Sequence, residues 1–293
     1  MLALIAGTGA LPAAVLGALP ERPLVCALDG FTPEVLVDLT FRIERLGGFL
    51  ETLKARGVTR VCMVGAIRRP AVNPRALDLA TLRLLPTIWR SLRKGDDGAL
   101  RGFIAVLEQR GFQVVGAHEA APALLPPAGV PTKAQPLVQH RADALAGQVQ
   151  LAIMGAADLG QACVIRDGAV IAAEDDAGTD AMLLKLQPEM TREVMASDPL
   201  TWAIDALIDW FESVPAASQD IEGAILFKGP KPRQDRRADL PVIGLRTAMN
   251  AAAAGLAGIV IEADGVMVLD LAGLIGVLDA QGMFLWVRPK GTA

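Results

Sequence analysis

The first half of the chain alternates short apolar runs with segments of helical spacing. Buried strands are expected at residues 2–6, 24–28, 58–64 and 112–115, and each run ends at a glycine or an aspartate. Helices are expected at residues 49–56, in a stretch that ends near Arg93 and Lys94, and at residues 98–110. Apolar strands that alternate with helices predict a parallel, doubly wound, Rossmann-like α/β sheet.

The second half also predicts mixed α/β structure. A helix is expected at residues 137–158, and Asp167 and Gly168 form the turn of a hairpin that follows it. Asp198 and Pro199 begin another helix, which has one apolar face. The remaining strands are expected at residues 224–227, 259–261, 266–269 and 283–287, and the remaining helices at 247–256 and 271–281.

Five prolines, at positions 122, 126, 127, 131 and 136, separate the two halves. They lie in a stretch with little periodicity, as is typical of a linker. We therefore expect a first domain at residues 1–121, a linker at 122–136 and a second domain at 137–293.

Composition excludes several classes of protein. Of the 293 residues, 52% are hydrophobic and 20% charged, so the chain is not disordered. The net charge of −4 gives no indication of a nucleic-acid partner. The sequence has no Tyr and only two His, which excludes Tyr-based proton transfer and His-rich metal sites.

The cysteines and the N-terminus bear on location. Cys26, Cys62 and Cys163 lie in apolar runs without a C-x-x-C pair, so reduced thiols and a cytoplasmic location are expected. Residues 1–20 carry no charged side chain, but glycines and Pro12 interrupt the run. We expect neither a signal peptide nor a membrane helix there.

A glycine-rich turn follows the first strand. Gly7, Thr8, Gly9 and Ala10 precede a helix, where backbone N–H groups and the helix dipole favour a phosphate. Asp29 follows the second strand, where a dinucleotide fold places a ribose-binding acid, but Pro12 replaces the third glycine of that fingerprint. A nucleotide site is favoured, and a simple tight turn is the alternative.

Two further segments combine charge with turns. Residues 93–98 contain Lys94 and Asp96, which could bind a diphosphate or Mg²⁺ or could form a solvated turn. Residues 174–182 contain Gly178 and Thr179 at a helix start, an arrangement that suits an anion, and Asp180, which could orient a metal-bound water. Helix capping is the alternative for the second segment.

The strongest local signal is a basic loop between two apolar runs. Residues 228–237 hold five cations, which suits neutralisation of a diphosphate, although a basic surface loop is the alternative. Asp239 follows these cations, and a carboxylate there would stay ionised and suit metal ligation or water orientation.

These segments, in this order, resemble the LpxI type of UDP-2,3-diacylglucosamine pyrophosphatase of lipid A biosynthesis. The resemblance is carried by LALIAGTGALP, KGDD, GAHE, GTDAM, KGPKPRQDRRADLPVIG and AGLAGIVIEA. It implies a two-domain hydrolase that yields UMP and 2,3-diacylglucosamine 1-phosphate (lipid X). The domain at residues 1–121 would then bind the nucleotide (UDP) part, and the domain at residues 137–293 would be catalytic. The resemblance also implies Mg²⁺, or another divalent cation such as Mn²⁺ or Co²⁺, and a functional Asp at position 239.

From the residues and the resemblance together we expect water to attack a phosphorus of the diphosphate. Asp239 would bind the metal or activate the water, and Asp180 is a second expected metal ligand. Expected substrate-binding residues are Gly7, Thr8, Gly9, Ala10, Lys94, Asp96, Gly178, Thr179, Lys228, Lys231, Arg233 and Gln234.

Two other functions stay open from the sequence: a nicotinamide-dependent oxidoreductase and a non-catalytic protein that binds UDP-sugars or lipids. Peripheral contact with the cytoplasmic face of the inner membrane and a homodimer also stay open. The sequence does not determine which phosphorus is attacked, the acyl chain length, the number of metal ions or the role of residues 187–220.

Overall fold

The computed structural model describes residues 1–67, 72–84, 86, 95–157, 159–188, 221–231, 235–237 and 240–290. The chain forms two compact units. The first unit comprises Met1–Leu124 and Asp235–Leu240, and the second comprises Leu125–Gln234 and Pro241–Ala293. The second half of the chain therefore contributes a short segment to the first unit.

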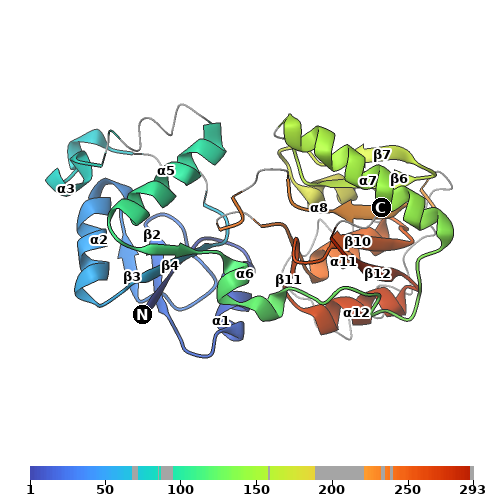
Figure 1. The fold of residues 1–293 in the computed structure, drawn as a ribbon, viewed down its shortest axis with the longest axis horizontal. Helices are drawn as coiled ribbons and strands as arrows, with labels where there is room; N and C mark the ends of the chain where they lie inside the picture. Colours follow the sequence, from blue (N-terminus) through green and yellow to red (C-terminus); the bar gives the residue numbers. More distant parts are fainter. Residues whose placement is uncertain are drawn as a thin grey trace. The chain divides into compact units, whose positions relative to one another are not determined.

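The first unit is built on a parallel five-stranded sheet (Figure 1). Its strands have the order β3-β2-β1-β4-β5, in which the direction of winding reverses between β1 and β4. All five residues of β1 are buried, so both faces of the sheet are covered, as in other parallel sheets. The strand bounds are β1 Leu2–Ala6, β2 Leu24–Leu28, β3 Leu39–Phe41, β4 Arg60–Val64 and β5 Gln113–Val115.

Helices α2 and α5 cover one face of this sheet. Leu50 and Leu53 of α2 and Leu107 of α5 share a buried cluster with Ile5 and Val61. Each such side chain contributes about 1.5–3 kcal/mol of stabilisation relative to an exposed one. The α-helices described in this unit are α1 Leu11–Ala18, α2 Leu46–Ala55, α3 Leu79–Leu82, α5 Gly95–Gln109 and α6 Ala117–Ala120, with 3₁₀ turns η1 Ile43–Arg45, η2 Pro74–Ala76 and η3 Pro122–Leu124.

The second unit contains a mixed five-stranded sheet of order β12-β10-β8-β6-β7. Strands β8, β10 and β12 are parallel, and β6 is antiparallel to both β8 and β7. A separate parallel pair joins β9 to β11. The bounds are β6 Ala162–Arg166, β7 Ala169–Ala173, β8 Ile225–Lys228, β9 Val242–Ile243, β10 Gly258–Glu262, β11 Met267–Val268 and β12 Phe284–Arg288.

The two faces of this sheet carry different helices. Leu226 belongs to the cluster formed with α8, α11 and α12, whereas Phe227 belongs to the cluster formed with α7, which packs along β6 and β7 (Figure 1). Gly147 of α7 lies against the Phe227 ring, where a Cβ atom would be 2.6 Å from the ring. The helix bounds are α7 Val138–Ala156, α8 Thr179–Leu186, α11 Leu245–Ala253 and α12 Leu271–Ala280.

The structure confirms the predicted α/β class and differs from the prediction in detail. Strands β3 and β9 were not expected, and residues 125–136 belong to the second unit. There the buried Thr132 hydroxyl oxygen accepts a hydrogen bond from the N–H of Leu285, and Gly129 pairs with Val287. The helices expected near Arg93 and after Asp198 lie outside the described residues.

All three cysteines are buried and unpaired, as expected for core thiols. Burial raises the pKa of Cys26, Cys62 and Cys163 to about 12, so these thiols stay protonated at neutral pH. Within the described residues, no helix has the length and apolarity needed to cross a membrane.

Candidate active site

In the first unit, the glycine turn lies at the point where the sheet reverses its winding. Its first two N–H groups are used inside the protein: Gly7 donates to the Val64 oxygen at 2.8 Å, and Thr8 donates to the Ala66 oxygen at 2.9 Å. Within the described part of the chain, the N–H groups of Gly9 and Ala10 make no backbone hydrogen bond, so they are the N–H groups of this turn that a ligand could use. Open α/β sheets bind ligands at this position, beyond the carboxyl ends of the strands.

Only glycine fits at two positions of the turn. A Cβ atom on Gly7 would lie 2.5 Å from the Ala66 oxygen, and Gly9 has a φ of +93°. Helix α1 follows with a proline in its first turn, and its N-cap residue, Ala10, makes no side-chain capping hydrogen bond.

His118 of the first unit lies in the short helix α6, which follows β5. Its Nδ1 atom is buried and has no hydrogen-bond partner among the described residues. Burial, assisted by Arg236, lowers the pKa of His118, so the imidazole is neutral at pH 7. A Cβ atom on Gly116 would lie 3.1 Å from the Arg236 oxygen, so the segment 235–237 packs against the end of β5.

Ion pairs hold this segment in place. The Arg237 guanidinium donates to both carboxylate oxygens of Asp235, at 2.9 and 2.8 Å, and to Glu108 of α5 at 2.6 Å. The hydrogen bond from Arg237 holds the pKa of Asp235 below its usual value of 3.8. Arg237, one of the five cations of the basic loop, is thus committed to structure within the first unit.

Replacing Asp235 with Asn is expected to lower the thermal midpoint more at pH 7 than at pH 3. Because the folded-state pKa of Asp235 is depressed, its stabilisation is present above pH 3.8 and is lost as the pH falls through the folded-state value. The partly exposed pair contributes about 0.2–1 kcal/mol. Thermal unfolding at both pH values measures the difference, with the exposed Asp176→Asn as control. An equal loss at both pH values would contradict it.

In the second unit, three buried polar side chains are joined by hydrogen bonds at the carboxyl end of β8. The Lys228 Nζ donates to the Thr179 Oγ1 at 2.7 Å, and the Thr179 hydroxyl donates to the Glu174 Oε1 at 2.8 Å. Lys228, Thr179 and Glu174 are 7%, 6% and 9% exposed. Lys228 and Thr179 were expected at the site from the sequence, and Glu174 was not.

Asp180 lies beside this chain of hydrogen bonds. Its Oδ2 accepts from the Arg246 Nε at 2.6 Å, whereas its Oδ1 is buried without a hydrogen-bond partner among the described residues. Mg²⁺ is commonly held by one or two carboxylates together with substrate phosphates, and an unpaired carboxylate oxygen fits that role. Within the described part of the chain, no group of three or more His, Cys, Asp or Glu side chains is placed to hold a metal ion.

Two more charged residues end the neighbouring parallel strands of the second unit. Glu262 ends β10 and lies opposite Arg288 of β12. Glu262 also packs on Gly229, where a Cβ atom would be 3.3 Å from its carboxyl carbon, and burial raises the pKa of Glu262. Sequence reasoning missed both residues, although a charged residue that ends an apolar strand was a signal for them.

The other predicted residues divide as follows. Gly178, which has a φ of +90°, precedes α8, and Lys231 lies just beyond β8, both in the second unit. Asp96 falls within α5, and its side chain is not among those described. Lys94, Arg233, Gln234 and Asp239 lie outside the described residues.

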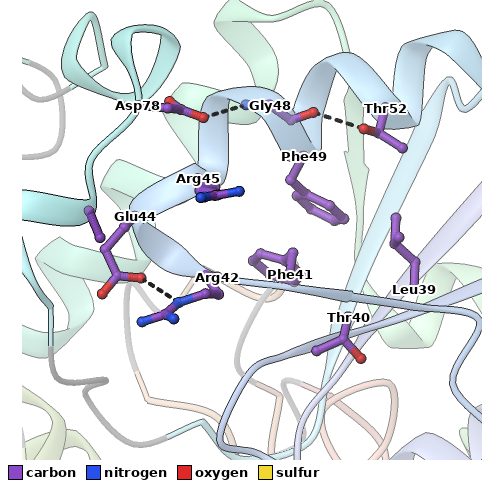
Figure 2. Close-up of a pocket in the computed structure, with 11 residues that line it drawn as sticks. Leu39, Thr40, Phe41, Arg42, Glu44, Arg45, Gly48, Phe49, Thr52 and Asp78 are labelled. Carbon is purple, nitrogen blue, oxygen red and sulfur yellow. Dashed lines mark hydrogen bonds and ion pairs between the residues drawn. The ribbon is translucent and has the colours of Figure 1, made fainter.

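A cavity of about 710 Å³ lies elsewhere in the first unit, between β3 and α2. Figure 2 shows Phe41 and Phe49 facing one another there, with ring centroids 3.9 Å apart. Arg42 and Arg45 share the lining with Glu44 and Asp78, so the charges balance. None of the predicted site residues lines this cavity.

The fold and these sites define a two-domain α/β protein in which each unit presents polar groups at the carboxyl ends of parallel strands. Residues 1–124 match the LpxI N-terminal domain, and residues 127–286 match the LpxI C-terminal domain. The chain therefore belongs to the LpxI family. It is 34% identical, over 99% of its length and 98% of the relative's, to UDP-2,3-diacylglucosamine pyrophosphatase LpxI of Caulobacter vibrioides.

Proposed function

We propose that this protein hydrolyses the diphosphate of UDP-2,3-diacylglucosamine to UMP and 2,3-diacylglucosamine 1-phosphate. The observation that carries the proposal is the similarity, over 99% of this chain, to a relative named UDP-2,3-diacylglucosamine pyrophosphatase LpxI. Family membership also favours this hydrolysis over the nicotinamide-dependent oxidoreductase that the glycine turn left open.

Cations of the second unit would suit a diphosphate. The Lys228 ammonium would offset negative charge on the phosphates, together with Lys231 and Arg233. In the first unit, the N–H groups of Gly9 and Ala10 would donate to the nucleotide part of the substrate. The remaining predicted substrate contacts, from Lys94, Asp96, Gly178 and Gln234, stay part of the proposal.

In the reaction, the oxygen of a water molecule forms a bond to one phosphorus, and the bond from that phosphorus to the bridging oxygen breaks. Asp239 would accept the proton of the water or hold a divalent cation. Asp180 is the second proposed metal ligand, through its Oδ1 atom, which has no hydrogen-bond partner among the described residues. A bound Mg²⁺, Mn²⁺ or Co²⁺ would offset charge that develops on the phosphates. In-line positioning and charge neutralisation are the main terms of such a mechanism.

The test is an assay of the purified full-length protein with UDP-2,3-diacylglucosamine and Mg²⁺. We expect UMP and the sugar 1-phosphate in equal amounts, detected by mass spectrometry, and no UMP after chelation of the metal. Reaction in ¹⁸O-labelled water shows which product carries the new oxygen, and hence which phosphorus is attacked. Binding of the substrate without release of UMP would overturn the proposal in favour of a carrier protein.

Location and assembly belong to the same proposal. A cytoplasmic protein that meets its lipid substrate by peripheral contact with the inner membrane would suit this reaction. Membrane contact and a homodimer remain predictions, to be measured by vesicle sedimentation and by light scattering.

A further inference from the structure

We propose that Glu174 is a positioning residue that fixes the Thr179 hydroxyl and, through it, the Lys228 ammonium at the carboxyl end of β8. The inference rests on the proposed function, in which Lys228 offsets charge on the diphosphate. Glu174 itself would not touch the substrate. It follows β7, and its carboxylate is two hydrogen bonds away from the Lys228 Nζ.

The donors and acceptors leave one direction for these hydrogen bonds. A lysine ammonium only donates, and an ionised carboxylate only accepts. The Thr179 oxygen accepts from the Lys228 Nζ at 2.7 Å, so its single proton points to the Glu174 Oε1, 2.8 Å away. The Thr179 hydroxyl therefore has no proton left for a phosphate, and its role is to hold the lysine.

Contacts to the carboxylate, the backbone and the side-chain stem hold Glu174 in place. Its Oε2 accepts from the backbone N–H of Gln161 at 2.6 Å, and its own N–H donates to the Ala162 oxygen at 2.9 Å. Gly160 leaves the space for its stem, because a Cβ atom there would lie 2.5 Å from the Glu174 Cβ. The carboxylate is thus fixed before any ligand binds.

The negative charge of Glu174 also lies near the buried Lys228 ammonium and helps to stabilise it. All three side chains are buried, and a buried ammonium needs a nearby opposite charge. The two acids that follow Glu174 in the chain, Asp175 and Asp176, are exposed, and Asp175 pairs with Lys185 at 3.0 Å. Removing the charge of Glu174 would leave Lys228 less strongly held in its present position.

The test compares steady-state kinetics of four variants. Glu174→Gln and Thr179→Val are each expected to lower kcat/KM about 10- to 100-fold, as for a lost hydrogen bond to a charged group. Thr179→Ser restores the hydroxyl and is expected to stay within about twofold of wild type, as is the exposed control Glu222→Gln. Thermal midpoints show whether each variant is folded.

The double variant tests whether the residues act as one chain. If they do, Glu174→Gln combined with Thr179→Val lowers kcat/KM no further than the more damaging single variant. If the fold-losses in kcat/KM of the two single variants multiply in the double variant, Thr179 and Glu174 act separately. That result would overturn the inference. Full activity of Glu174→Gln in an enzyme whose wild type releases UMP would also overturn it.

A measurement without substrate separates this inference from the proposed function. In ¹H–¹⁵N spectra of lysine ammonium groups, a buried and hydrogen-bonded Lys228 is expected to give a slowly exchanging signal, assigned by its loss in Lys228→Met. Glu174→Gln is expected to broaden that signal through faster exchange with water. An unchanged signal would overturn the positioning role, whereas an inactive wild type would overturn only the hydrolase proposal.

Discussion

Replacing Asp239 with Asn is expected to lower the rate of UMP release about 10²- to 10⁴-fold, the usual contribution of an acid–base group. The exchange keeps the volume of the side chain and removes its negative charge and its basic oxygens. The Asn side chain can therefore neither accept a proton from water nor offer a metal ion a charged ligand. The rate is measured under saturating substrate and Mg²⁺.

The matched control for this variant is Glu21→Gln, which removes the charge of an exposed carboxylate of the first unit. It is expected to release UMP at the wild-type rate. The thermal midpoint of Asp239→Asn shows whether a loss of rate is a loss of fold. An Asp239→Asn protein with the wild-type rate would remove Asp239 from the mechanism.

Replacing Gly7 with Ala is expected to destabilise the first unit by about 1–3 kcal/mol, the range for an overpacked position. The new Cβ would lie 2.5 Å from the Ala66 oxygen and 2.9 Å from the Gly65 carbonyl carbon, which are backbone atoms of the neighbouring strand end. The strand ends must then separate, and this moves Gly9 and Ala10. Urea unfolding measures the stability, and KM for the UDP-lipid measures the site.

Gly17→Ala is the matched control for this prediction. Gly17 lies in α1 of the same unit, and a Cβ atom there would have no neighbour within 4 Å. Alanine is expected to stabilise the helix by about 0.4–1 kcal/mol, because it restricts the unfolded chain. If Gly7→Ala and Gly17→Ala changed the free energy of unfolding equally, the close approach of Gly7 to Ala66 would not explain the effect of Gly7→Ala.

Local signals in the sequence predicted much of the fold. The hairpin turn at Asp167 and Gly168 has positive φ at both residues, +49° and +76°, as a two-residue turn requires. The helix expected at residues 271–281 also begins with a local feature, because the Asp270 side chain accepts a hydrogen bond from the Gly273 N–H at 2.9 Å. These features depend on residues close together in the chain.

Features that depend on distant partners could not be predicted in this way. Strand β3 has three residues and pairs with β2, and β9 has two residues and pairs with β11. Prolines indicated a linker at 122–136 because they limit helix and sheet pairing. They do not show whether the chain packs on a surface, as the buried Thr132 does.

The candidate site shows the same division. Thr179 and Lys228 were found because a glycine before a helix and a basic loop are local signals, yet they are 49 residues apart and their contact is tertiary. Glu174 joins them because β7 returns alongside β6 and ends next to α8. The spacing of these residues in the sequence does not predict this contact.

The segment Asp235–Leu240 has a consequence for how the protein is made. The first unit cannot gain its full set of contacts until the ribosome has synthesised residue 240, and all of residues 125–234 must precede it. An early product ending at Leu124 would lack the Arg237–Glu108 ion pair and would expose the end of β5 around His118. The first unit is thus completed only after residues 125–234 have been synthesised, and dividing the gene after Leu124 would leave the N-terminal product incomplete.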